Sequence, residues 1–126
     1  MTRLSAISVF VADLDRSSEW YGNVLGLPLE FADEESAVFR FDNTLINLLR
    51  VRAAVDLVAP HTPTVPGTHP QVQFSLWIDD VDAFCAELAT KGIALVNGPI
   101  DRPWGLRTAC FADPDGHLWE VAHPLT

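Results

Sequence analysis

The sequence has few basic residues and no long apolar run. Its 126 residues include 8 Lys and Arg against 17 Asp and Glu, a formal charge of −9 at pH 7. Phosphate binding needs a basic surface, so nucleic acid is not an expected partner. No apolar stretch approaches the roughly 18–20 residues of a transmembrane helix, and the first residues lack a signal-peptide pattern. Neither a membrane partner nor secretion is expected.

Cysteine is also scarce. Cys85 and Cys110 are isolated and form no metal-binding motif. Such thiols are typical of reduced cysteines in a cytoplasmic protein, with a disulfide as the less favoured alternative. The four histidines have no ligand spacing and are expected mainly at the surface; they are His61, His69, His117 and His123. A hydrophobic content of 48% is enough for one folded domain over residues 1–126.

The chain contains two related halves. Residues 8–15 (SVFVADLD) return 67 positions later as residues 75–82 (SLWIDDVD), and residues 42–48 return 73 positions later as residues 115–121. Two landmarks in the same order indicate a duplicated module. Such a module has a pseudo-twofold axis where equivalent residues meet, so we look for a site there.

Each half has the pattern of a βαβββ module. Apolar residues alternate over 6–11, and Asp13 or Asp15 begins a helix to about residue 25, with Gly26 after it. The second helix is expected over about 80–91, between Asp80 and Gly92. Strands are predicted at 29–31, 37–41 and 44–51 in the first half, and at 71–78, 93–96, 106–112 and 118–122 in the second.

The proline-rich stretch between the halves separates the two modules. It holds four of the nine prolines and Gly67, so no long regular element is expected there. We therefore predict a first module over about 1–58, a linker over about 59–70 and a second module over about 71–126.

Three motifs resemble one known superfamily. Residues 13–17 (DLDRS), Trp20-Tyr21 and residues 24–27 (VLGL) resemble the first-helix signature of the vicinal oxygen chelate superfamily, which includes glyoxalase I, extradiol dioxygenases and the bleomycin and mitomycin resistance proteins. Residues 113–120 (DPDGHLWE) resemble its C-terminal hairpin, and residues 103–105 (PWG) a segment of its antibiotic-binding branch. The resemblance implies an α+β fold in which two βαβββ modules form a curved mixed sheet around a cleft, and commonly a homodimer.

Four positions decide whether the chain carries the metal of its metal-dependent relatives. The resemblance and the repeat offsets place these ligand positions at Ala6, Asn47, Gln73 and Glu120. Ala6 has no donor atom, and the two amides are weak ligands for Zn, Ni, Mn or Fe. No metal or other cofactor is therefore expected. Gln73, Glu120 and Asn47 are the candidate ligands if one binds, and Glu120 is the single candidate catalytic group.

The same alternation predicts what else lines the cleft. Phe10 and Trp77 share a face with Ala6 and Gln73, and Trp104 in its Pro-Trp-Gly loop is placed to stack on a planar ligand. Ordinary core packing is an equal alternative for these three aromatic residues, and the favoured one for Trp119. Glu120 needs a partner, either a bound cation or Arg40 or Arg107.

These residues favour a small-molecule binding protein of the bleomycin/mitomycin-resistance type over an enzyme. Its ligand would be aromatic, with a cationic group as one option. Phe10, Trp77 and Trp104 would provide stacking, and Asn47, Gln73 and Glu120 would orient the ligand. The alternative is a metal-dependent lyase, isomerase or dioxygenase of the same superfamily. A third option is a subunit with a vestigial pocket. Antibiotic resistance would be the cellular role in the first case.

Overall fold

The computed structural model describes residues 2–63 and 72–126, which fall into two compact units, Met1–Gly67 and Thr68–Thr126. We describe each unit by itself. Among the described residues, no helix is both long enough and apolar enough to cross a membrane. Part of the predicted linker, residues 64–71 with His69, lies outside the described residues.

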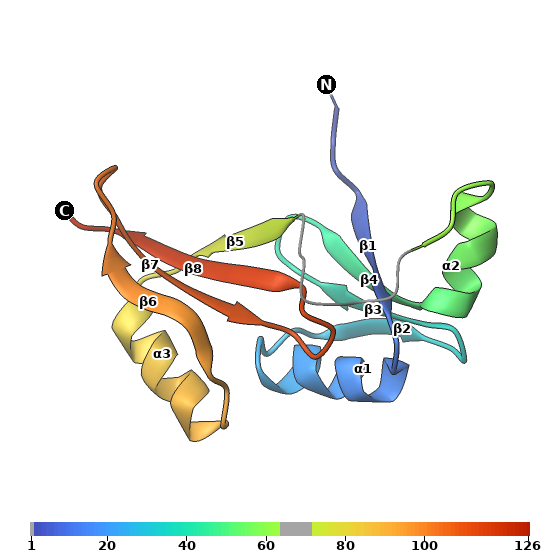
Figure 1. Ribbon diagram of the computed structural model, residues 1–126, viewed down its shortest axis with the longest axis horizontal. Helices are drawn as coiled ribbons and strands as arrows, with labels where there is room; N and C mark the ends of the chain where they lie inside the picture. The colour runs from blue at the N-terminus through green and yellow to red at the C-terminus, as the bar shows by residue number, and fades with distance from the viewer. Residues whose placement is uncertain (1, 64–71) are drawn as a thin grey trace. The chain divides into compact units, whose positions relative to one another are not determined.

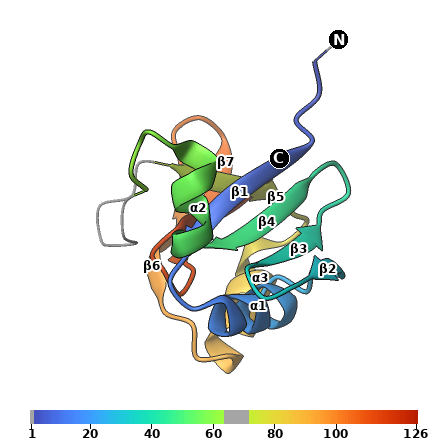
Figure 2. The same cartoon turned by 90° about the vertical axis from the view of Figure 1, so that its right-hand side faces the viewer.

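Unit 1 is a four-stranded mixed sheet with the strand order β1-β4-β3-β2 (Figures 1 and 2). The first and last strands, β1 and β4, run parallel, and the other neighbours are antiparallel. Its elements are β1 (Ala6–Val11), α1 (Leu14–Asn23), β2 (Leu29–Ala32), β3 (Ser36–Arg40), β4 (Leu45–Arg50) and α2 (Val51–Val58).

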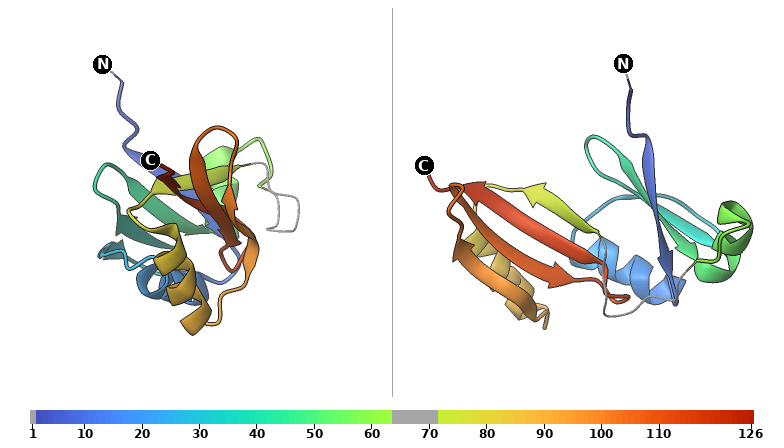
Figure 3. Two further views of the ribbon diagram at one scale, coloured as in Figure 1. Left: turned by 90° about the vertical axis from the view of Figure 1, so that its left-hand side faces the viewer. Right: turned by 45° about the horizontal axis from the view of Figure 1, so that its top comes forward.

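Unit 2 repeats this topology with the order β5-β8-β7-β6, and β5 again runs parallel to β8 (Figure 3). The duplicated module and the α+β class are therefore confirmed. Its elements are β5 (Gln73–Trp77), α3 (Val81–Thr90), β6 (Leu95–Asp101), β7 (Leu106–Ala112) and β8 (Leu118–Pro124).

Equivalent aspartates begin the two long helices. The Asp13 carboxylate accepts the backbone N–H of Arg16 at 3.1 Å, and that of Asp80 accepts the N–H of Ala83 at 3.0 Å. Each bond satisfies one of the free N–H groups of a helix N-terminus. The α3 N-terminus has a second acceptor, because the Val81 N–H donates to Nδ1 of His123 at 2.9 Å. His123 thus has a structural contact that its sequence position did not suggest.

The core of each unit lies between its sheet and its long helix. Alternate strand residues are buried there, as the period-two pattern predicts. Tyr21 from α1 lies beside Phe39 in unit 1, and Phe84 from α3 lies beside Phe111 in unit 2. Trp119 is buried and packs against Phe74 at 4.9 Å between ring centroids, so its predicted core role is confirmed.

Several element boundaries differ from the prediction. The strand expected to reach residue 51 ends at Arg50, and an unpredicted helix, α2, follows directly and contacts β4 and β1. Helix α1 ends at Asn23 rather than near residue 25. Strand β6 starts at Leu95 and runs through Gly98-Pro99 to Asp101, not over 93–96. Proline is tolerated there because β6 is an edge strand.

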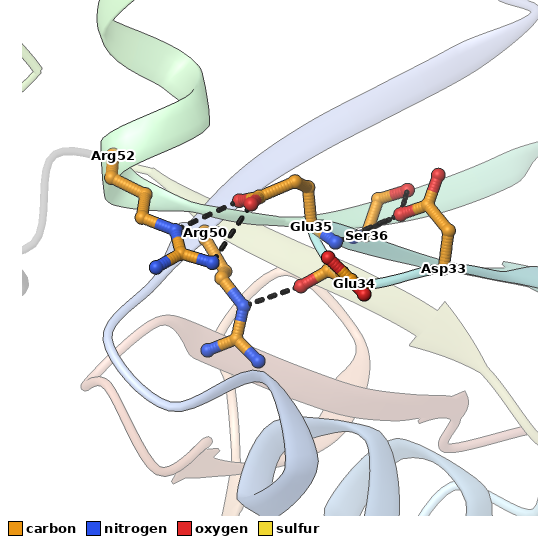
Figure 4. Close-up of polar contacts among 6 residues, drawn as sticks. All are labelled: Asp33, Glu34, Glu35, Ser36, Arg50 and Arg52. Atoms are coloured by element: carbon orange, nitrogen blue, oxygen red, sulfur yellow. Dashed lines mark hydrogen bonds and ion pairs between the residues drawn. The ribbon is translucent and has the colours of Figure 1, made fainter.

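An arginine pair joins the start of α2 to the β2–β3 hairpin (Figure 4). Arg52 donates two hydrogen bonds to the Glu35 carboxylate, at 2.8 and 3.0 Å, and Arg50 Nε donates to the Glu34 carbonyl oxygen at 2.6 Å. The hydrogen bond from Arg52 holds the pKa of Glu35 below its ordinary value. In the turn, Asp33 accepts the backbone N–H groups of Glu35 and Ser36, which lowers the Asp33 pKa.

The lowered pKa of Glu35 predicts a specific loss of stability in acid. The folded state binds the proton of the Glu35 carboxyl group more weakly than the unfolded state does. The contribution of ionised Glu35 to stability is therefore fully present above the unfolded pKa, about 4.3. It is lost as the pH falls through the folded pKa. We expect the difference between the urea unfolding midpoints at pH 7 and pH 3 to be smaller in Glu35→Gln than in the wild type, because the variant lacks this acid-dependent contribution to stability. Glu34→Gln is the matched control and should keep the wild-type dependence; equal behaviour of the two variants would contradict the assignment.

Candidate functional site

The face of the unit 2 sheet opposite α3 carries the polar and aromatic residues predicted to line a site. Within the described part of unit 2, α3 is the one helix, and it packs on the other face. Gln73, Ser75 and Trp77 of β5 are exposed on this open face, while Phe74 and Leu76 between them are half-buried toward the helix. The Trp77 side chain is 67% exposed, so core packing is ruled out for it.

Two hydrogen bonds order the polar residues of this open face. The Ser75 hydroxyl donates to Oε1 of Glu120 at 2.8 Å, across the parallel pair of β5 and β8. Gln73 Nε2 donates to the Cys110 Sγ at 3.4 Å, and Cys110 lies directly opposite Glu120 on β7. Gln73, Ser75, Cys110 and Glu120 therefore form one polar group on three neighbouring strands.

The predicted arginine partners of Glu120 are wrong. Arg40 forms an ion pair with Glu30 within unit 1. Arg107 forms ion pairs with Asp82 and Asp101, both at 2.7 Å. Strand alternation explains the second error, because Arg107 is three residues from Cys110 and so points to the α3 face, away from Glu120.

The ion pairs of Arg107 join β6, β7 and the start of α3. The guanidinium of Arg107 holds the pKa of Asp101 below its ordinary value. On the same helix, burial and the nearby Asp82 raise the pKa of the Cys85 thiol. A raised thiol pKa means little thiolate at neutral pH, so Cys85 has the character of a structural residue rather than a nucleophile.

Unit 1 carries the equivalent pair at Ser8 and Asn47. These residues correspond to Ser75 and Glu120 by the two repeat offsets, and they also lie opposite each other on parallel strands. Asn47 Nδ2 donates to the Ser8 hydroxyl oxygen at 3.2 Å. The other amide atom, Asn47 Oδ1, is buried and has no partner among the described residues. Phe10 is half-buried and Ala6 exposed on the same face.

The tip of the β6–β7 hairpin extends the open face of unit 2. Figure 1 shows this tip at the same end of the unit as the final residues of β5 and β8. Trp104 lies in the tip and is 65% exposed, so core packing is ruled out for it too. The Arg102 guanidinium lies 5.7 Å from the centre of the Trp104 ring. Gly105 has a φ of +91°, which a side chain would strain.

The four family ligand positions do not make a good transition-metal site. Position 6 has no donor, and two of the remaining three side chains are neutral amides. Gln73 turns its amide N–H to Cys110, and Glu120 already accepts a hydrogen bond from Ser75. Zinc and iron sites use about three imidazole, thiolate or carboxylate ligands. One carboxylate and two amides do not match that set.

A second group of ligand-type atoms lies in the turn before β8. Ligand atoms of Asp113, Asp115 and His117 lie within 4.8 Å of one another. Oδ1 of the buried Asp113 accepts the backbone N–H groups of Asp115 and His117, at 2.9 and 2.8 Å. These hydrogen bonds are typical of a turn that an Asp side chain stabilises, so the burial of Asp113 has a structural explanation without a metal ion.

Comparison with known proteins places this geometry in a family. Residues 3–121 match the model of the Glyoxalase/Bleomycin resistance protein/Dioxygenase superfamily, and the chain belongs to that superfamily. It is 35% identical over 124 residues to the protein YraH of Bacillus subtilis (strain 168), covering 94% of this chain and 96% of that one.

Two solved structures have the same fold. A glyoxalase/bleomycin resistance protein/dioxygenase from Nocardioides has a TM-score of 0.88 at 21% identity, covering 99% of this chain and 85% of that one. TnmS3, an antibiotic binding protein from Streptomyces sp. CB03234, has a TM-score of 0.76 at 27% identity, covering 98% and 97%.

The buried oxygen of Asn47 predicts an unusual response to mutation. An unpartnered buried acceptor costs about 1–3 kcal/mol, so Asn47→Leu should raise the free energy of unfolding by about 1 kcal/mol. Ser8→Ala removes the one hydrogen bond that the Asn47 amide makes among the described residues and should lower the free energy of unfolding. Urea unfolding at pH 7 measures both. Destabilisation by Asn47→Leu as large as that by Ser8→Ala would mean that Oδ1 has a partner.

Proposed function

We propose that this protein binds a planar aromatic small molecule on the open face of unit 2, without a resident metal. The observation that carries the proposal is the exposure of Trp77 and Trp104, 67% and 65%, beside an ordered polar group. Large exposed aromatic side chains next to a few fixed polar groups are typical of ligand sites. The rings would stack on the ligand, and Gln73 and Glu120 would orient it.

Two further points support binding rather than catalysis. The family ligand positions have a poor donor set, and TnmS3, with the same fold, is an antibiotic binding protein. The alternative, a metal-dependent lyase, isomerase or dioxygenase, depends on Gln73 and Glu120 acting as ligands with help from a third group. The roles predicted for Phe10 and Asn47 in ligand binding stay predictions. So do a homodimer, a cytoplasmic location and a role in antibiotic resistance.

The stacking role can be tested with a neutral planar probe, naphthamide, by isothermal titration calorimetry. We expect Trp77→Ala and Trp104→Ala each to weaken binding about tenfold, because each removes an aromatic contact surface. Leu57→Ala is the matched control, since Leu57 is also an exposed apolar side chain, 62%, but lies on α2. Wild-type affinity in both tryptophan variants would contradict the proposal.

The absence of a resident metal is tested separately. Protein purified without chelator and refilled with Zn²⁺, Ni²⁺, Mn²⁺ or Fe²⁺ should retain far less than one ion per chain after dialysis, by elemental analysis. Glu120→Gln removes the single carboxylate of the four positions and should leave that result unchanged. Tight stoichiometric metal that disappears in Glu120→Gln would overturn the proposal and favour the enzyme.

A further inference from the structure

Arg102 is a cation on the binding face that no described carboxylate neutralises. Four of the other basic residues form ion pairs, namely Arg40, Arg52, Lys91 and Arg107. Arg102 instead donates from Nε to the Thr108 hydroxyl at 3.0 Å and lies over the Trp104 ring. Arg3, Arg16 and Arg50 form no ion pair among the described residues either, so what distinguishes Arg102 is its place over an exposed aromatic ring of this face.

The surroundings of Arg102 fix its position. Thr108 is 1% exposed and belongs to one row of neighbours across the sheet, formed by Trp77, Ala122, Thr108 and Ile100. The bond to Thr108 anchors Nε, and the central carbon of the guanidinium lies over the Trp104 ring at 5.7 Å from its centre. The terminal nitrogens have no partner among the described residues. A guanidinium held in this way presents a rigid fork of N–H donors at its edge.

Arg102 and the exposed rings match one kind of ligand. Trp77 and Thr108 lie two strands apart in their row, about 10 Å at the usual strand spacing. A bicyclic aromatic ring with a carboxylate spans this distance. Glu120 lies one row away and accepts the Ser75 hydroxyl, so this face carries one charge of each sign, and the positive one lies beside the Trp104 ring.

We propose that Arg102 binds the carboxylate of a planar aromatic acid whose ring stacks on Trp77 and Trp104. The inference rests on the proposed binding function and names its ligand class. It departs from the cationic ligand that the net charge of −9 and Glu120 suggested, because the charge that lies against the exposed Trp104 ring is that of Arg102.

Three probes of one shape and different charge test the proposal: naphthoate, naphthamide and naphthylmethylammonium. Affinities are measured by calorimetry at pH 7 and low salt. We expect naphthoate to bind about tenfold more tightly than naphthamide, as a charge-assisted pair predicts, and the ammonium most weakly. Arg102→Gln should reduce the naphthoate-to-naphthamide ratio to about one. Arg16→Gln, the same change of charge on α1, should keep the wild-type ratio.

Each of the other possible outcomes contradicts a defined part of the proposal. Equal binding of naphthoate and naphthamide, or tightest binding of the ammonium, overturns the carboxylate site but leaves the binding function. A ratio that persists in Arg102→Gln assigns the preference to another group. No binding of any probe overturns the binding function and this inference with it. If Arg102→Gln fails to fold by circular dichroism, Arg102→Lys decides, because it keeps the charge without the fork and should still lower the ratio.

Discussion

The parallel pairing of the first and last strand in each module is the constraint on which the rest of the structure depends. It sets β1 beside β4 and β5 beside β8 in fixed register. A slip by one residue would turn every side chain to the other face. Held in register, it buries one face under a helix and places Ser8 beside Asn47 and Ser75 beside Glu120 on the other. The buried core and the open polar face of each unit are therefore two results of a single alignment.

Much of this arrangement follows from the sequence because it depends on local periodicity and on the repeat. Alternation over 6–11 and 73–77 assigns side chains to faces, and Asp13 and Asp80 mark the helix starts. Helix α2 could not be found in this way. It continues an apolar strand without a Gly, Pro or capping signal, since its N-cap is Arg50 with no side-chain bond. Its helical form depends on the packing of Ala54, which is fully buried.

Strand alternation predicted part of the candidate site but not its hydrogen bonds. Strand alternation selected Gln73, Trp77 and Glu120 for the open face, yet the partner of Glu120 is a serine and not an arginine. Long side chains reach across several positions, so the sequence does not show which acceptor each one finds. Arg102 is the clearest case, because its role depends on the fold of a hairpin tip and on a buried threonine six residues later.

The hairpin tip also separates an exposed charge and aromatic ring of unit 2 from its paired strands. Arg102 and Trp104 belong to the connection after β6, outside the strand pairs that align the sheet. Substitutions of Arg102 or Trp104 alter charge and aromatic surface without changing a residue of the paired strands. On the proposed binding function, a lineage built on this module could exchange one class of small molecule for another in a few mutational steps. Its selectivity is free to evolve at little risk to its architecture.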